Sequence, residues 1–200
     1  MKYFVTAIDT DSGKTLVSAI LCQALGADYW KPVQAGLPRD TDTVTALSPG
    51  ITTHPERYLL NTPASPHAAA AIDGVTIHME DFNLPITSRP LVIEGAGGCL
   101  VPLSDTHFVI DLITHLQAEV VLVADLYLGS INHTLLTFEA LKKRGVPIKG
   151  IIFNGNANPE SERIILLHTG LACLLRIEKE NSVTPDTVRK YAHQLKLNWK

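Results

Sequence analysis

The sequence contains few cysteines, no excess of positive charge and no long apolar segment. Its three cysteines, Cys22, Cys99 and Cys173, are too widely spaced to indicate a metal-binding pair or a disulfide framework. Lysine and arginine total 17 against 20 aspartate and glutamate residues, giving a net charge of −3. Proteins that bind nucleic acid through phosphate neutralisation usually carry a basic excess, so nucleic acid is not an expected partner.

The features of membrane and exported proteins are also missing. No uncharged apolar run reaches the roughly 18 residues that a membrane-spanning helix needs. The first residues, MKYFVTAIDT, become polar at Thr6, too early for the apolar core of a secretory signal. Unpaired cysteines are typical of a reducing compartment. We therefore expect no membrane partner and a cytoplasmic location.

The composition is that of a folded globular protein. Apolar residues make up 46 % of the chain and charged residues 18 %, a balance that argues against extensive disorder. A length of 200 residues suits one domain. We therefore expect a single domain over residues 1–200, large enough to bury a core without disulfides or a structural metal.

Short runs rich in valine and isoleucine alternate with amphipathic stretches. Such runs predict strands that are buried on both faces, as in a parallel sheet. These runs are Tyr3–Ala7, Pro90–Glu94, Glu119–Ala124 and Ile148–Phe153, and a further strand is expected at Tyr29–Lys31. Helices are expected at Lys14–Leu25, His67–Ile72, Phe108–Leu116 and Asn132–Arg144. This order predicts an α/β fold, a mainly parallel sheet with helices on both faces.

Two regions are less regular. Residues 36–90 contain six prolines before Pro90 itself, and long irregular segments of compact domains are often functional. We interpret this region as an excursion that shapes a site. The part of the chain from about Arg176 onward is polar and shows no strong strand pattern.

The clearest motif is AIDTDSGKT at residues 7–15. A strand, a loop ending in Gly-Lys-Thr and a helix form the context of a phosphate-binding loop, so the fold class is that of P-loop NTPases. Gly13 lets the backbone bend closely around a bound phosphate group. Backbone N–H groups and the helix dipole attract the negative charge of the phosphates. Lys14 would reach the β- and γ-phosphates, and the Thr15 hydroxyl would bind Mg²⁺. The loop begins with Ala7, where the general pattern has glycine.

The loop also disfavours one subclass. Partition and maturation ATPases carry an additional lysine near the start of the loop, where this chain has Ile8. No lysine lies between Lys2 and Lys14. The sequence therefore points away from those ATPases.

Carboxylates and a second lysine follow other expected strands. Metal-assisted phosphoryl transfer needs further oxygen ligands. Glu94 ends the strand PLVIE and precedes the small residues GAGG, and Asp42 lies in DTDTV with Asp40 as its nearby competitor. Lys31 ends its strand at the edge of the sheet where ligands usually bind, so it could hold an anionic group of the substrate.

Together these segments resemble the dethiobiotin synthetase family. The matching pieces, in the family's order between residues 3 and about 156, are FVTAIDTDSGKT, YWKPVQAG, DTDTV, ASPHAAA, VIEGAGGCLVPLSD, YLGSINHT and IIFN. The resemblance implies an ATP- and Mg²⁺-dependent ligase. Its substrate would be 7,8-diaminopelargonic acid, which captures CO₂ as a carbamate. ATP would convert the carbamate to a carbamic–phosphoric anhydride, and ring closure to dethiobiotin would release phosphate, leaving ADP.

The resemblance also implies roles for the matching residues. The nucleotide phosphates would be lined by Asp11, Ser12, Gly13, Lys14, Thr15 and Leu16. The metal would be held by Thr15, Asp42 and Glu94, and Glu94, Gly95, Ala96 and Gly97 would border phosphate and substrate. Lys31, Lys14 and Thr10 would be catalytic, Thr10 and Lys31 would face the substrate, and Asn154 would contact adenine. The distant substrate carboxylate would bind Leu128, Gly129, Ser130, Ile131 and Asn132 of a second subunit, which implies a homodimer with shared sites.

Two segments depart from the family pattern. Some members have Ala-Ser-Gly after Lys-Pro-Val, and the serine contacts substrate; this chain has Gln34-Ala35-Gly36. Two alternatives stay open: Gln34 replaces this contact with substrate, or the contact is dispensable. The segment LLRIEKENS lacks the proline that follows the corresponding strand in the family. The adenine pocket beyond Asn154, and with it the nucleotide preference, is left open.

Two other functions compete with this interpretation. A related synthetase of the amidotransferase type would need a glutaminase domain with a catalytic cysteine, for which 200 residues leave no room. A non-catalytic nucleotide-binding module would be expected to lose lysine or carboxylate positions, whereas Lys14, Lys31 and Glu94 are present.

Overall fold

The computed structural model describes residues 1–199, and a seven-stranded sheet lies at its centre. The strand order is β4-β2-β6-β1-β7-β8-β9, and each pair of neighbours is parallel. The strands are β1 (Lys2–Ala7), β2 (Asp28–Trp30), β4 (Thr53–His54), β6 (Leu91–Gly98), β7 (Glu119–Asp125), β8 (Ile148–Asn154) and β9 (Cys173–Ile177). Because the strands are parallel, their carboxyl ends meet at one edge. The last residue of the domain predicted over 1–200 lies outside the described residues.

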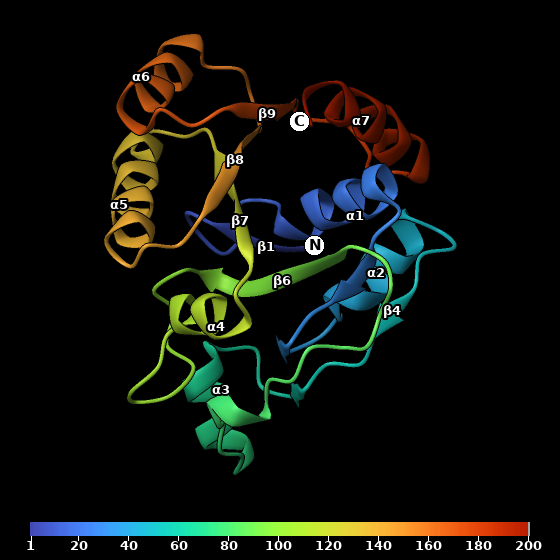
Figure 1. Cartoon of the computed structure of the whole chain (residues 1–200), viewed down its shortest axis with the longest axis vertical. Coiled ribbons are helices and arrows are strands. Elements are labelled where there is room, and N and C mark those ends of the chain that lie inside the picture. The colour runs from blue at the N-terminus through green and yellow to red at the C-terminus, as the bar shows by residue number, and fades with distance from the viewer. Residues whose placement is uncertain (200) are drawn as a thin grey trace.

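Helices cover both faces of the sheet, as predicted (Figure 1). One face is covered by α1 (Lys14–Leu25), α2 (Asp40–Leu47) and α7 (Pro185–Asn198). The other face is covered by α3 (Pro66–Asp73), α4 (Val109–Leu116), α5 (Ser130–Lys143) and α6 (Pro159–Thr169). In residues 1–199, no helix combines the length and apolar character that crossing a membrane requires.

The apolar character of the strands follows from this layering. In β1, Phe4 packs into the core on the α4 face, whereas Tyr3 and Val5 pack into the core on the α1 face. Successive side chains of a strand point to opposite faces, and here both faces are buried. A central strand therefore shows a continuous apolar run instead of alternation.

The irregular region after β2 is folded against the sheet. It contains a small two-stranded parallel sheet of β3 (Val33–Ala35) and β5 (Tyr58–Leu60), together with α2, α3 and a 3₁₀ helix at Met79–Asp81. The expected helix at His67–Ile72 is confirmed as α3, which is one residue longer at each end. This region contributes one wall of the cavity described below.

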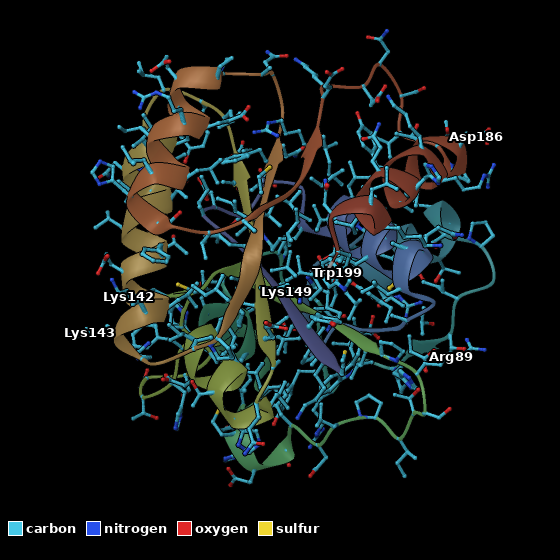
Figure 2. The ribbon with its side chains drawn as sticks, turned by 45° about the horizontal axis from the view of Figure 1, so that its top comes forward. Arg89, Lys142, Lys143, Lys149, Asp186 and Trp199 are labelled. Atoms are coloured by element: carbon cyan, nitrogen blue, oxygen red, sulfur yellow. The ribbon has the colours of Figure 1, made fainter. Side chains whose placement is uncertain are left out.

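The expectation of no strand near Arg176 is wrong. Residues Cys173–Ile177 form β9, which pairs with β8 at the edge of the sheet, and α7 packs on α1. The ammonium of Lys149 on β8 lies 5.5 Å from the ring centroid of Trp199, just after α7 (Figure 2). The strand is short and has the exposed Arg176 between buried Leu175 and Ile177, so its pattern is weak.

The packing of α7 can be tested with two leucines of the same helix. Leu195 is fully buried, whereas Leu197 is largely exposed. Leu195→Ala leaves a cavity between α7 and the core and should lower the free energy of unfolding by about 2–5 kcal/mol. Leu197→Ala should change it by no more than about 0.5 kcal/mol. Urea denaturation measures both, and equal losses would contradict the packing described here.

Candidate functional site

A cavity of about 590 Å³ opens at the carboxyl edge of the sheet. Its walls come from the β1–α1 loop, the ends of β2 and β6, the β3 strand and the segment before α3. The predicted site residues that line it are Thr10, Asp11, Gly13, Lys14, Thr15, Lys31, Gln34, Glu94, Ala96 and Gly97. The structure therefore gathers half of the predicted residues around one space.

The last residue of β8, Asn154, packs against the phosphate loop. Gly13 has a φ of 93°, and an added Cβ would lie 2.4 Å from Nδ2 of Asn154. That same amide nitrogen donates a hydrogen bond of 2.9 Å to the carbonyl of the buried Ser12. Asn154 thus supports the loop, and its predicted contact with adenine remains a prediction. Leu16 lies half-buried in the first turn of α1.

Lys14 lies inside the loop. Its ammonium donates hydrogen bonds to the carbonyls of Asp9, at 3.0 Å, and Thr10, at 2.7 Å. Burial, followed by the positive charge of Lys31, lowers the pKa of Lys14 to about 8. An anion bound in the cavity would stabilise the charged form of this lysine, as expected for a group that binds phosphate.

A hydroxyl and two carboxylates meet where α1, α2 and β6 approach one another. The Thr15 hydroxyl lies 3.0 Å from Oδ1 of Asp40 and 3.0 Å from Oε1 of Glu94. Both carboxylates also contact Lys31, whose Nζ is 2.6 Å from Oδ2 of Asp40 and 3.2 Å from Oε1 of Glu94. The ammonium donates a third hydrogen bond, 3.1 Å long, to the carbonyl of Gly95.

Lys31 is buried yet charged. Burial alone would lower the pKa of its ammonium, but the carboxylates of Glu94 and Asp40 outweigh this effect and raise it above the ordinary value. Only 4 % of the residue is exposed. The structure therefore favours the charged form of a lysine that lines the cavity.

The donor set of this cluster fits Mg²⁺. Thr15, Asp40 and Glu94 offer hard oxygen ligands from three elements. Within residues 1–199 there is no group of three or more His, Cys, Asp or Glu side chains suited to hold a metal ion. A site with few protein ligands suits Mg²⁺, which usually keeps several waters and binds the phosphates of its substrate.

The prediction that chose Asp42 over Asp40 for this cluster is not supported by the geometry. The side chain of Asp42 is 58 % exposed and forms an ion pair with Arg39, whose hydrogen bonds hold the pKa of Asp42 below its ordinary value. Helix α2 begins at Asp40, and two residues advance an α-helix by about 200°. Asp42 therefore faces away from Thr15, and Asp40 takes the position beside it.

Gln34 is used within the protein. Its amide oxygen accepts a hydrogen bond from the backbone N–H of Asp40, and its amide nitrogen donates one to the carbonyl of Gly36, each 3.0 Å long. The side chain is buried at the cavity wall. Gln34 thus fixes the start of α2, and its predicted contact with substrate remains a prediction.

The segment Leu128–Asn132 lies apart from the residues that line this cavity. It forms the turn before α5 and the first residues of that helix. Leu128 is fully exposed, whereas Ser130 is buried. The segment does not enter the cavity of its own chain, so its predicted role requires a second copy.

Sequence reasoning missed two side chains of this site. The sequence names Asp40 only as the alternative to Asp42 for the metal site. The helical phase of α2 is the signal that decides which of the two carboxylates faces Thr15. Tyr29, whose hydroxyl contacts Glu94, was read only as part of an apolar strand. No local pattern marks that contact, because the partners lie on different strands.

The support of the loop by Asn154 can be tested with two glycines of positive φ. A Cβ on Gly13 meets Asn154, whereas a Cβ on Gly26 meets nothing within 4 Å. Gly13→Ala should distort the loop at the cost of about 1–3 kcal/mol, typical of overpacking, which corresponds to about fivefold weaker ATP binding or more. Gly26→Ala should leave ATP affinity unchanged. Calorimetric titration measures both, and an equal effect of the two changes would contradict this role of Asn154.

Solved structures with a similar fold include a ParA family ATPase and a putative plasmid partition protein. The ParA family ATPase from Chlorobium tepidum superposes with a TM-score of 0.53 at 16 % identity, covering 98 % of this chain and 92 % of that one. A putative plasmid partition protein from Borrelia burgdorferi, bound to AMPPNP, gives a TM-score of 0.57 at 10 % identity over 97 % and 95 %. At these identities the likeness shows the P-loop fold alone.

Sequence comparison is more specific. A family model described as an AAA domain matches residues 1–187. The ATP-dependent dethiobiotin synthetase BioD of Cytophaga hutchinsonii is 58 % identical over 99 % of this chain and 98 % of its own length. The enzyme of that name from Rhodopseudomonas palustris is 49 % identical over 92 % and 89 %. This chain belongs to the family of ATP-dependent dethiobiotin synthetases.

Proposed function

We propose that this chain converts 7,8-diaminopelargonic acid, CO₂ and ATP to dethiobiotin, ADP and phosphate. Its relatives are named ATP-dependent dethiobiotin synthetases, which supports the overall reaction. The observation that carries the proposal is the meeting of Lys14, Lys31 and the cluster of Thr15, Asp40 and Glu94 around one cavity. These groups suit phosphoryl transfer to an anionic acceptor.

The first chemical problem is repulsion between two anions. CO₂ on one amine of the substrate gives a carbamate, and a carbamate oxygen must then approach the γ-phosphate of ATP. The ammonium groups of Lys31 and Lys14 would lie beside these anions and stabilise the charge of the transferring group. ADP leaves as the carbamate oxygen bonds to phosphorus, giving the carbamic–phosphoric anhydride.

Ring closure needs little further chemistry from the protein. The second amine attacks the carbonyl carbon, phosphate leaves, and loss of the amine proton gives the cyclic urea. Both amines belong to one molecule, so proximity favours the step. Thr10 lines the cavity beside the phosphate loop, where it would face the carbamate.

The metal would be held by Thr15, Asp40 and Glu94. When bound, Mg²⁺ supplies positive charge to the phosphate oxygens. Lys31 bridges the two carboxylates in this structure, so its ammonium offsets part of their negative charge while it faces the cavity. Gln34 holds the backbone of Asp40 and thereby keeps this carboxylate at the cluster.

The proposal includes a homodimer with shared sites and a cytoplasmic location. The exposed turn at Leu128 and the start of α5 would bind the distant substrate carboxylate in the cavity of a second copy. Helix N-termini bind anions through free N–H groups and the helix dipole. The three cysteines are free, in keeping with a reducing compartment.

The overall reaction is tested by incubating the chain with Mg-ATP, bicarbonate and 7,8-diaminopelargonic acid. ADP and dethiobiotin should form in equal amounts, and ADP formation should require the diamine. ATP turnover that ignores the diamine would contradict the proposed function.

The assignment of Asp40 is tested against its neighbour Asp42. Asp40→Asn should raise the Mg²⁺ concentration that gives half-maximal activity by more than about tenfold. Loss of a residue that only orients a metal ligand already weakens metal affinity by about tenfold or more, and loss of a direct ligand should weaken it further. Asp42→Asn breaks only an exposed ion pair, worth about 0–1 kcal/mol, and should leave this concentration unchanged. Magnesium titrations of initial rate measure both. The reverse ranking would restore Asp42 as the metal ligand.

The shared site is tested by mixing two inactive variants. Lys31→Ala should lower kcat by about 100-fold or more, as removal of one preorganised charge donor does, and Asn132→Ala should disturb the helix start that the partner needs. A heterodimer of the two holds one intact site, so subunit exchange should restore up to about a quarter of the original activity if the dimer is twofold symmetric. No recovery after proven exchange would contradict sharing.

A further inference from the structure

Tyr29 carries a buried hydroxyl that the proposed chemistry does not use. It is the middle residue of β2 and is fully buried in the core on the α1 face. Its hydroxyl donates a hydrogen bond of 3.0 Å to Oε2 of Glu94. Buried polar groups are nearly always hydrogen-bonded. The partner of this hydroxyl, the Glu94 carboxylate, therefore indicates its role.

The two oxygens of Glu94 have different partners. Oε1 is 3.0 Å from the Thr15 hydroxyl and 3.2 Å from the Lys31 ammonium, on the cavity side. In the described part of the chain, the donor to Oε2 is Tyr29. Glu94 is only 1 % exposed, so water offers little replacement for a lost donor. An unpaired buried carboxylate oxygen is strongly unfavourable.

The sheet brings these two side chains together and holds the ring in place. Tyr29 pairs with Val92 of β6, and Glu94 follows two residues later on the same face of that strand. Both neighbours of β2 in the sheet, β4 and β6, are present, so the strand is fixed on both sides.

We propose that Tyr29 is a positioning residue for the metal-binding carboxylate. By holding Oε2, it sets the rotation of the Glu94 carboxylate so that Oε1 faces Thr15 and the cavity. This inference rests on the proposed role of Glu94 as a metal ligand. Hydrogen bonds to a ligating carboxylate orient it, and their loss typically weakens metal affinity by about 10–100-fold.

The test is Tyr29→Phe, which removes one oxygen and keeps the ring. Binding of a nonhydrolysable ATP analogue is measured by calorimetry, first in EDTA and then over a range of Mg²⁺ concentrations. Without metal, the affinity should equal that of the unaltered chain, because Tyr29 does not line the cavity. The Mg²⁺ concentration that gives half of the gain in affinity should rise by about tenfold or more.

Tyr191→Phe is the matched control. Tyr191 is also buried, and its hydroxyl donates to a carboxylate, Glu180, but this pair belongs to the C-terminal segment away from the cavity. The control loses the same oxygen and should keep the original dependence on Mg²⁺. An equal shift in both variants would show a general loss of stability and would overturn the proposal.

Glu94→Gln separates this inference from the function on which it rests. If Glu94→Gln abolishes the gain from Mg²⁺ while Tyr29→Phe leaves it unchanged, Glu94 is a ligand and the inference about Tyr29 is wrong. If Glu94→Gln itself leaves the gain unchanged, the metal role proposed for Glu94 fails, and the inference fails with it.

The double variant Tyr29→Phe/Glu94→Gln gives a second test that does not depend on the folding of Tyr29→Phe alone. Replacing both partners leaves no buried carboxylate oxygen without its donor, and Lys31 keeps Asp40 as its ion-pair partner, so this protein should fold. If Tyr29 acts through Glu94, the double variant and Glu94→Gln should show the same dependence on Mg²⁺. A further weakening in the double variant would mean that Tyr29 acts by another route.

Discussion

A buried ammonium shared between two carboxylates is the interaction on which the site depends. Lys31, the residue that follows β2, joins Asp40 at the start of α2 to Glu94 on β6. Removing one partner of a buried ion pair leaves an uncompensated charge and typically destabilises a protein by about 3–5 kcal/mol. The charged groups that would bind substrate and metal therefore also hold three elements of the cavity together.

Much of the fold follows from local sequence. The Val- and Ile-rich runs gave the central strands, and Lys14–Leu25 is helical over its predicted range, because buried parallel strands and amphipathic helices have short-range patterns. Strand β9 escaped because it is an edge strand with an exposed arginine. The phosphate loop was predictable for the same local reason, since its strand, glycine, lysine and helix are contiguous.

The parts of the site that were not predicted depend on phase and on strand order. Asp40 and Asp42 lie in one short segment, and only the starting point of α2 decides which of them faces Thr15. The contact of Tyr29 with Glu94 joins residues 65 positions apart, on strands whose pairing no local pattern specifies. The fold itself does not settle function, because a ParA family ATPase and a putative plasmid partition protein have a similar fold. The charged residues on it and the close relatives are what point to ring closure.

The fit between Gly13 and Asn154 has a consequence for how this loop can be changed or moved. The amide of Asn154 occupies the volume that any side chain at position 13 would need, and it binds the neighbouring carbonyl of Ser12. The shape of the loop thus depends on β8, a strand far from it in the sequence. Grafting residues 7–15 onto another scaffold would transfer the motif without the Asn154 side chain that supports it. Positions 13 and 154 should also change together during evolution.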